Sequence, residues 1–254
     1  MEEQYNIRSI ERALNILKCF NENRTEIGLL EFAEMLSLNK STVFRILTNL
    51  NNCGFVDVNA EGKYILGSEI IRLGNIRHEN DLLKAEAIKI LNELQTLTNE
   101  TVILIRYNNY KATCIDKIES SNDLKIVSEI GRNIPMLKGA SGKVIAAHLS
   151  ESELERCFAI QQNLFNYRDD LNILKDEFKT IRENGYCLTT SEVDAGVTAF
   201  AVPIFGAAGS VIGSVSIAGP NFRFNDEVII SIKDRVLNRI YQLSQKMGYK
   251  QVQA

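Results

Sequence analysis

The chain has 254 residues and a formal net charge of −3, with 45% hydrophobic and 24% charged residues. These values are typical of a globular protein and exclude the disordered and fibrous classes. They also exclude an attraction of the whole chain to nucleic acid, so any such binding has to be local.

Two further features of the sequence restrict where the protein works. No stretch approaches 18 uninterrupted apolar residues and no apolar core follows a basic start, so we expect neither a membrane-spanning helix nor a secretory signal. The five cysteines are scattered and form no CxxC pair, which predicts no zinc site and no disulfide framework. We therefore expect a cytoplasmic protein without a bound metal or a cofactor.

The first part of the chain is predicted to contain short helices followed by a hairpin. Apolar residues at helical spacing indicate the helices, and a polar turn between two strand-like runs indicates the hairpin. The expected helices are 9–20, 29–36, 40–52 and a connecting helix 67–80, and the expected hairpin pairs 55–58 with 63–66. Gly54 is expected to end the third helix, and Gly74 to interrupt the connecting helix.

The second part is predicted to be one domain of helices and an antiparallel-leaning sheet. Its expected helices are 83–97, one from the Gly-rich turn 137–143 through Leu149, 151–159, 169–184 and 225–247. Its expected strands are 101–107, 111–118, 124–130, 185–190, 198–205 and 210–218. The fold class is therefore α+β.

The helices 29–36 and 40–52, joined by a three-residue turn, have the dimensions of a helix-turn-helix. Stepping 100° per residue places Val43, Ile46, Leu47 and Leu50 on one face of the second helix. The opposite face carries hydroxyls, amides and one guanidinium: Ser41, Arg45, Thr48 and Asn52, flanked by Thr42 and Asn49. Such groups bind base edges in a major groove.

Local charge supports binding to DNA at this helix. From residue 37 to 53 there are two basic residues, Lys40 and Arg45, and no acid. Lys40 suits a phosphate, and Lys63 in the hairpin is expected to supply one more backbone contact. Few cations per chain indicate a dimer on a two-fold, palindromic site. The alternative is that this polar face is only solvated, and the hairpin favours the DNA-binding interpretation because the elements together make a winged module.

Several short motifs lie in collinear order over nearly the whole chain. In the first part they are Ser9-Ile10-Glu11-Arg12-Ala13-Leu14, Leu38-Asn39-Lys40-Ser41-Thr42-Val43-Phe44-Arg45-Ile46-Leu47 and Tyr64-Ile65-Leu66-Gly67. In the second part they are Gly131, Pro135-Met136, Ala140-Ser141-Gly142-Lys143, Gly185-Tyr186, Ser191-Glu192, Gly196-Val197, Pro203-Ile204 and Ser216-Ile217-Ala218-Gly219-Pro220. No single motif is specific, but the set in this order resembles the IclR family of bacterial and archaeal transcription regulators.

The resemblance implies a winged helix-turn-helix domain (1–67), a linker helix (68–80) and a GAF-like effector-binding domain (81–254). It implies a homodimer through the N-terminal domains, in some members assembled into a tetramer. It also implies that a small organic acid or aromatic effector controls the affinity for an operator. We expect a repressor of a catabolic or neighbouring operon whose DNA contacts are Lys40, Ser41, Thr42, Arg45, Thr48, Asn49 and Lys63.

The resemblance further implies an effector pocket made of the Gly-rich loop and later strands. On this chain its residues are Ala140, Ser141, Thr189, Val197, Ala199, Ser216 and Ala218. The backbone N–H groups of a loop ahead of a helix suit a carboxylate. Where the glyoxylate- and pyruvate-responding members carry an acid and a Cys, this chain has Thr189 and Ala199, so the same ligand is not implied. No Arg or Lys is expected to project inward. The alternative is that these small residues serve ordinary strand packing.

Two other classes of function are weighed against the regulator. An enzyme has little support, because the two histidines, His78 and His148, and Cys187 lack an evident catalytic partner. The loop 139–143 fails the phosphate-binding pattern, and a Ser141–Lys143 pair is too little to argue catalysis. A ligand-binding signalling module without a DNA function is the other alternative, and a test of the N-terminal domain for salt-dependent preference for a palindromic site discriminates between the two.

Overall fold

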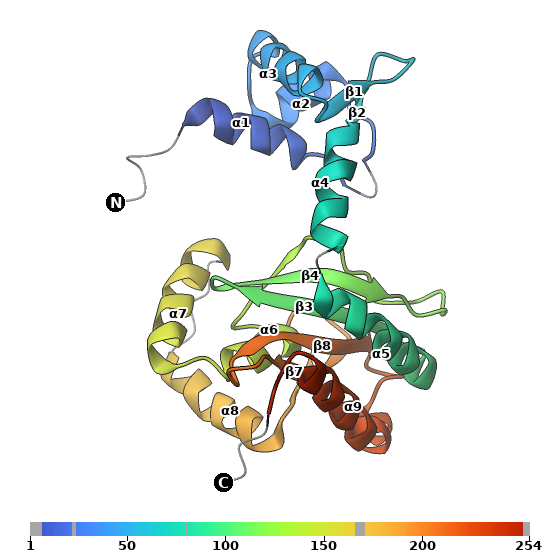
Figure 1. Cartoon of the computed structure of the whole chain (residues 1–254), viewed down its shortest axis with the longest axis vertical. Coiled ribbons are helices and arrows are strands. Elements are labelled where there is room, and N and C mark those ends of the chain that lie inside the picture. The colour runs from blue at the N-terminus through green and yellow to red at the C-terminus, as the bar shows by residue number, and fades with distance from the viewer. Residues whose placement is uncertain (1–6, 22–23, 80, 166–170, 251–254) are drawn as a thin grey trace. The chain divides into compact units, whose positions relative to one another are not determined.

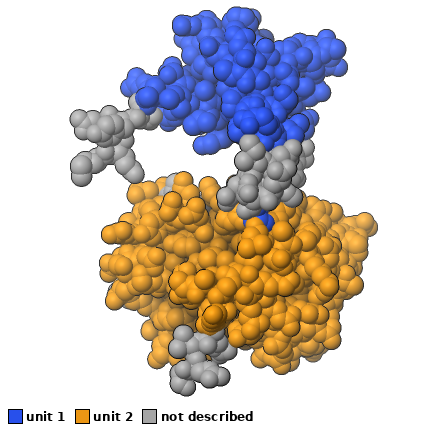
Figure 2. Space-filling view, in the orientation of Figure 1, with its two compact units in different colours: residues 1–81 blue, residues 82–254 orange. Residues whose placement is uncertain are grey.

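The computed structural model describes residues 7–21, 24–79, 81–165 and 171–250; the side chains of 75–79, 164–165 and 171–172 are outside this description. The chain divides into two compact units, 1–81 and 82–254 (Figure 2). Each unit has its own hydrophobic core, described below.

The first unit is a helix-turn-helix followed by a two-stranded hairpin (Figure 1). Its elements are α1 (Arg8–Leu17), α2 (Leu29–Leu36), α3 (Lys40–Asn52), β1 (Val56–Val58), β2 (Tyr64–Leu66) and α4 (Ser68–Glu79). The Glu31 carboxylate accepts a hydrogen bond from the Gly28 N–H at 2.7 Å and caps the start of α2. Ser37, with φ of 52°, ends α2 in the left-handed conformation and makes the turn into α3.

Apolar side chains from the three helices α1, α2 and α3, from the hairpin and from the segment between α1 and α2 meet in one core. The buried members are Ile16, Cys19, Ile27, Phe32, Val43, Leu47, Val56 and Tyr64. The hairpin turn is fixed by Asn59, whose side-chain oxygen accepts from the N–H groups of Glu61 and Lys63 at 3.0 Å. Two expectations need correction: α1 ends at Leu17 rather than at residue 20, and α4 continues through Gly74 without a break.

The second unit contains a six-stranded sheet in the order β5-β4-β3-β8-β7-β6, with antiparallel neighbours throughout. Its strands are β3 (Thr101–Asn108), β4 (Lys111–Ile118), β5 (Asn133–Ile134), β6 (Cys187–Thr190), β7 (Val197–Phe205) and β8 (Val211–Pro220). Its helices are α5 (Leu82–Thr98), α6 (Ala140–Ala146), α7 (Glu151–Phe165), α8 (Leu171–Asn184) and α9 (Asp226–Lys246).

Helices cover both faces of this sheet (Figure 1). Along β3, Val102 and Leu104 point toward the core shared with α5 and α9, whereas Ile103 and Ile105 point toward the core shared with α6, α7 and α8. This alternation follows from the two-residue period of a strand. The α+β class expected from the sequence is therefore confirmed. Within the described residues, the helices lack the combination of length and apolar character needed to cross a bilayer.

The expected strand 124–130 is wrong, because this segment is irregular and only Asn133–Ile134 forms a strand in the region. Two of its backbone carbonyls accept hydrogen bonds from side chains instead of from a neighbouring strand. The Thr101 hydroxyl donates to the Ile126 carbonyl at 2.8 Å, and the Arg223 guanidinium donates to the Leu124 carbonyl at 2.9 Å. The segment is consequently a loop rather than a strand.

Candidate functional site

The helix α3 has one buried and one exposed face. Val43 and Leu47 are fully buried in the core of the first unit. Ser41, Arg45 and Thr48 are exposed on the opposite side, as their helical positions predict. The polar face is thus open to a partner.

Two of the predicted DNA contacts are engaged inside the helix itself. The Thr48 hydroxyl donates to the Phe44 carbonyl at 2.8 Å, and the Asn49 amide donates to the Arg45 carbonyl at 2.7 Å. The Thr48 hydroxyl would have to rotate before donating to a base edge, whereas the Asn49 amide keeps a second N–H. Asn49 also lines a groove with apolar residues of α1, so it lies on the flank of α3 rather than on its outer face.

The cations of this unit differ in their surroundings. Lys40 and Arg45 lie at the exposed side of α3, and Thr42 beside them is half-buried. Lys63 in the hairpin lies 3.9 Å from the Glu26 carboxylate and 3.3 Å from the Glu61 carboxylate. Its charge is therefore partly neutralised, which weakens its expected contact with a phosphate.

Phe44 is a residue that the sequence reasoning missed. Its side chain is 53% exposed although it belongs to α3, and it lines a shallow hollow with Lys40 and Ser41. Apolar side chains at this end of a recognition helix contact thymine methyl groups. Phe44 directly precedes Arg45 of the polar face, and this position in the sequence could have identified it as a candidate.

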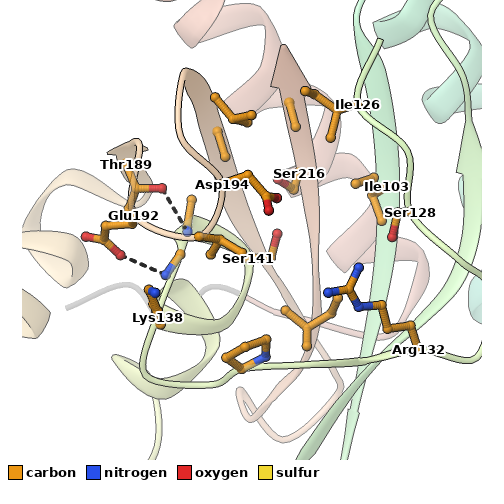
Figure 3. A pocket seen from close by; sticks show the side chains of 18 of the residues that line it. Ile103, Ile126, Ser128, Arg132, Lys138, Ser141, Thr189, Glu192, Asp194 and Ser216 are labelled. Atoms are coloured by element: carbon orange, nitrogen blue, oxygen red, sulfur yellow. Dashed lines mark hydrogen bonds between the residues drawn. The ribbon is translucent and has the colours of Figure 1, made fainter. Parts of the chain in front are cut away.

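A pocket of about 100 Å³ lies in the second unit, between the sheet, the loop before α6 and the irregular segment before β5 (Figure 3). At ~10–15 Å³ for each enclosed water, this space accepts a small organic molecule. All seven predicted effector residues line it: Ala140, Ser141, Thr189, Val197, Ala199, Ser216 and Ala218. Their local folds place them there, because α6 presents the first two and β6, β7 and β8 present the others.

Two of the backbone amides expected to bind a carboxylate, those of Gly139 and Ala140, already have partners. The Gly139 N–H donates to Oε2 of Glu192 at 2.8 Å, and the Ala140 N–H donates to Oγ1 of Thr189 at 3.1 Å (Figure 3). Glu192 and Thr189 thereby join the Gly-rich loop to the end of β6 and the turn after it. A ligand carboxylate at these amides would have to displace groups of the chain itself.

Lys143 connects this loop to α8. Its Nζ lies 2.6 Å from Oε1 of Glu192 and 2.9 Å from Oε1 of Glu177, and the side chain is buried. Burial lowers the pKa of Lys143, but the hydrogen bonds to Glu192 and Glu177 outweigh it, so the pKa is raised above its ordinary value. The ammonium is therefore permanently charged and held between two carboxylates.

Among the described residues that line the pocket, Ser216 alone has a buried hydroxyl without a hydrogen-bond partner. Its side chain is 1% exposed, and its Oγ makes no hydrogen bond. A buried hydroxyl without a partner costs free energy unless a bound group satisfies it. Ser216 thus marks the floor of the pocket as a place for a polar group of a ligand.

Charged side chains also line the pocket, and one expectation about them is wrong. No Arg or Lys was expected to project inward, yet Arg132 and Lys138 line the pocket together with Glu192 and Asp194. Figure 3 shows the Arg132 guanidinium entering from the side opposite to Thr189 and Glu192. The sequence reasoning missed Arg132 because the preceding segment was taken for a strand, whereas its loop carries the residue to the pocket.

The residues considered for catalysis do not form a reactive constellation. Burial raises the pKa of the Cys187 thiol to about 12, so the thiolate is absent at neutral pH. Lys143 is held by two carboxylates, as described above, which leaves Ser141 without a base from that side chain. The side chain of His78 lies outside the described residues. Among the side chains that are described, no three His, Cys, Asp or Glu gather in a way that would hold a metal ion.

A winged helix-turn-helix and a separate pocket for a small molecule together define the class of ligand-binding transcription regulators. The family comparisons agree over most of the chain: residues 9–60 match the IclR helix-turn-helix domain, and 77–245 match the C-terminal domain of the bacterial transcriptional regulator IclR. The chain belongs to the IclR family. It is a DNA-binding transcription regulator, and the family is not one of enzymes.

Individual relatives cover nearly the whole chain. The HTH-type transcriptional regulator XynR of Escherichia coli is 31% identical, over 96% of this chain and 98% of that protein. The solved structure of Thermotoga maritima IclR is 28% identical, with a TM-score of 0.77, over 96% of this chain and 100% of that one. An IclR homolog from Microbacterium hydrocarbonoxydans, solved with 4-hydroxybenzoate, shares the fold at 18% identity and a TM-score of 0.75, over 93% of this chain and 99% of that one.

Proposed function

We propose that this regulator binds a palindromic operator as a homodimer in the cytoplasm, and that a small organic metabolite in the pocket of the second unit controls its affinity for that operator. The observation that carries the proposal is the Ser216 hydroxyl, which is buried in the pocket without a partner. A buried polar atom of this kind favours an occupant that satisfies it.

The DNA-binding half of the proposal rests on α3. Arg45 and Ser41 read base edges, Lys40 binds a phosphate, and Thr42, Thr48, Asn49 and Lys63 make supporting contacts. The Thr48 hydroxyl first gives up its hydrogen bond within the helix. These contacts are few for one chain, which is why we propose two chains on a two-fold site.

The helix α1 supports a homodimer through the first unit. Ile7, Ile10 and Leu14 are 60%, 54% and 51% exposed and follow one another at helical spacing. Large apolar side chains aligned on an exposed helix face mark an interaction surface. We propose that the equivalent helix of a second chain covers them.

The ligand-binding half rests on the pocket. We propose that Ala140, Ser141, Thr189, Val197, Ala199, Ser216 and Ala218 contact the effector, the alanines and Val197 through van der Waals contact and the hydroxyls through hydrogen bonds. The 4-hydroxybenzoate bound to the Microbacterium homolog supports an organic acid or aromatic compound of that size.

The test is a measurement of operator affinity with and without ligand. An operator is first selected from random duplexes with the full chain, and binding is then followed by fluorescence anisotropy while small organic acids and aromatic compounds are added. We expect at least one compound to change the affinity, and the change to be reduced in Ser216→Ala but kept in Ser210→Ala, an exposed serine outside the pocket. Failure of every compound to change operator affinity would contradict ligand control.

The direction of control is a separate part of the proposal. We propose repression of a catabolic or neighbouring operon, because a dimer on an operator excludes other proteins from that DNA. Deleting the gene should raise the transcripts of neighbouring genes, and a fall in those transcripts would identify an activator instead.

A further inference from the structure

The charged groups around the pocket are distributed unevenly, and this distribution bears on how a ligand is oriented. On one side Glu192 and Glu177 share the ammonium of Lys143, which leaves an excess of one negative charge. Asp194 adds another carboxylate to the pocket lining. A ligand carboxylate on this side would meet like charges.

Several donors on that same side are already in use. The Gly139 and Ala140 amides donate to Glu192 and Thr189, and the Lys143 ammonium donates to two glutamates. Lys143 is buried and cannot turn toward a ligand without losing both ion pairs. Lys138 also lines the pocket, and in Figure 3 it lies on the Glu192 side, opposite to Arg132.

Arg132 is placed differently. Its guanidinium points into the pocket from the opposite side (Figure 3). Its backbone is fixed to β4, because its carbonyl accepts from the Cys114 N–H at 3.0 Å and the Gly131 N–H donates to the Cys114 carbonyl at 2.7 Å. A guanidinium offers a planar pair of donors that matches a carboxylate.

We propose that Arg132 is the residue that selects the ligand by charge, and that the ligand is a small carboxylate bearing a second oxygen. The carboxylate binds Arg132, and the hydroxyl or carbonyl oxygen lies against the buried Ser216 hydroxyl, which both donates and accepts. The ligand is thus oriented with its acid group away from the Gly-rich loop. This inference rests on the proposed function and names the chemistry of its pocket.

The carboxylate of Asp194 is expected to compete with a ligand carboxylate for the Arg132 guanidinium. Asp194 lines the pocket, is exposed, and lies between the two sides in Figure 3. Removing its charge should therefore strengthen the binding of an acid, while removing the charge of Arg132 should weaken it. The two substitutions act in opposite directions on the same ligand, which a general loosening of the pocket would not produce.

The experiment uses the full chain and three acids, pyruvate, lactate and 4-hydroxybenzoate, each compared with its neutral amide. Binding is measured as the rise of the melting temperature over concentrations up to about 10 mM, from which a Kd follows. We expect at least one acid to bind at least about tenfold more tightly than its amide. Arg132→Gln should remove this preference, Arg132→Lys should keep part of it, and Asp194→Asn should increase it.

Lys138→Gln is the matched control, because it removes a cation from the same pocket lining, and its acid-to-amide ratio should stay close to that of the unchanged chain. Arg132 and Lys138 are both exposed, so the unliganded melting temperatures verify that the variants fold. The proposal is overturned if no acid stabilises the unchanged chain, or if Arg132→Gln retains the preference. An amide that binds and alters operator affinity would refute the role of Arg132 while leaving ligand control intact.

Discussion

Arg45 and Lys40 both lie on the exposed side of α3, but they are expected to act on DNA in different ways. Replacing Arg45 by Ala should relax the base preference at one operator position by about 1–3 kcal/mol, because a guanidinium contacts a base bidentately. Replacing Lys40 by Ala should weaken binding to all sequences about equally, since a phosphate contact carries no sequence information. Titrations against single-base operator variants measure both effects, and an unchanged profile for Arg45→Ala would remove Arg45 from base recognition.

His148 is expected to make the stability of the second unit depend on pH. Its ring packs edge-on against Phe205 at 5.1 Å between centroids, and its Nδ1 lies 2.8 Å from the Val144 carbonyl. Burial lowers the pKa of His148 below its ordinary value of 6.5, and the charge of Arg182 adds to this, although the bond to Val144 opposes it.

The direction of this pH dependence follows from the number of protons that the folded and the unfolded chain bind. With the lower pKa in the folded state, the unfolded chain binds more protons, so the free energy of unfolding falls as the pH drops below about 6.5. This free energy is measured by urea unfolding between about pH 5.5 and 7.5, for the unchanged chain and for His148→Gln. The variant should show the weaker pH dependence in this range, and parallel curves would exclude His148 as the cause.

Side chains whose placement depends on local periodicity were predictable, and those placed by distant partners were not. The exposed side of α3 follows from its helical period, and the small residues of the pocket follow from motifs in the sequence. By contrast, Lys143 meets Glu177 and Glu192 from 34 and 49 residues away, and no local pattern signals that contact. Arg132 was missed for the same reason, because hydrogen bonds from distant side chains shape the preceding loop.

At the scale of elements, most helices and strands were predicted to within one or two residues, but α7 extends six residues beyond its expected end and one expected strand does not form. The apolar period defines α3 and α5 to within one or two residues, whereas β-branched residues at 124–130 indicated a strand that does not form. Strand propensity measures how well side chains fit a sheet surface. Here the side chains of Leu124, Val127 and Ile130 remain exposed and gain no packing on the sheet. The carbonyls of Leu124 and Ile126 accept from side chains instead.

The contact between α6 and the segment before it leaves no room for a side chain at Gly142. A Cβ there would lie 1.9 Å from the Pro135 carbonyl oxygen and 2.8 Å from the Met136 Cα. We expect Gly142→Ala to lower the free energy of unfolding by about 1–3 kcal/mol or more, because backbone atoms on both sides must move. Thermal or urea unfolding of the full chain measures the loss.

Gly74 in α4 is the matched control for this substitution. It is also helical, but a Cβ there would meet no atom within 4 Å. Gly74→Ala should therefore leave stability unchanged or raise it by about 0.5–1 kcal/mol through helix propensity. Equal losses in the two variants would contradict the steric explanation for Gly142.

At the scale of the whole molecule, a net charge of −3 leaves DNA binding to a small cationic surface. A homodimer brings two copies each of Lys40 and Lys63, the cations expected to contact phosphates, to the operator. At about 0.9 for each phosphate contacted, four contacts give a slope of log K against log salt of about −4. Anisotropy titrations between about 50 and 200 mM salt measure the slope.

The same measurement tests the role of α1. Ile10→Asp should weaken self-association in sedimentation and reduce the magnitude of the salt slope toward that of a single chain, because a charge in a dimer interface must be desolvated. Leu30→Asp, on an exposed leucine of α2, introduces the same charge outside this helix. Dissociation of both variants, or of neither, would contradict a dimer through α1.

The pairing of β3 with β8 sets the order in which the two units are able to form during synthesis. Thr101 pairs with Ala218, more than a hundred residues later, so the middle of the six-stranded sheet closes only when most of the chain has been made. The helix-turn-helix and its hairpin are complete by residue 66. Because synthesis runs from the N-terminus, the DNA-binding unit has all its partners well before the pocket exists. A chain terminated before β8 would therefore lack the pocket and bind no metabolite. It would retain the elements that are proposed to contact the operator.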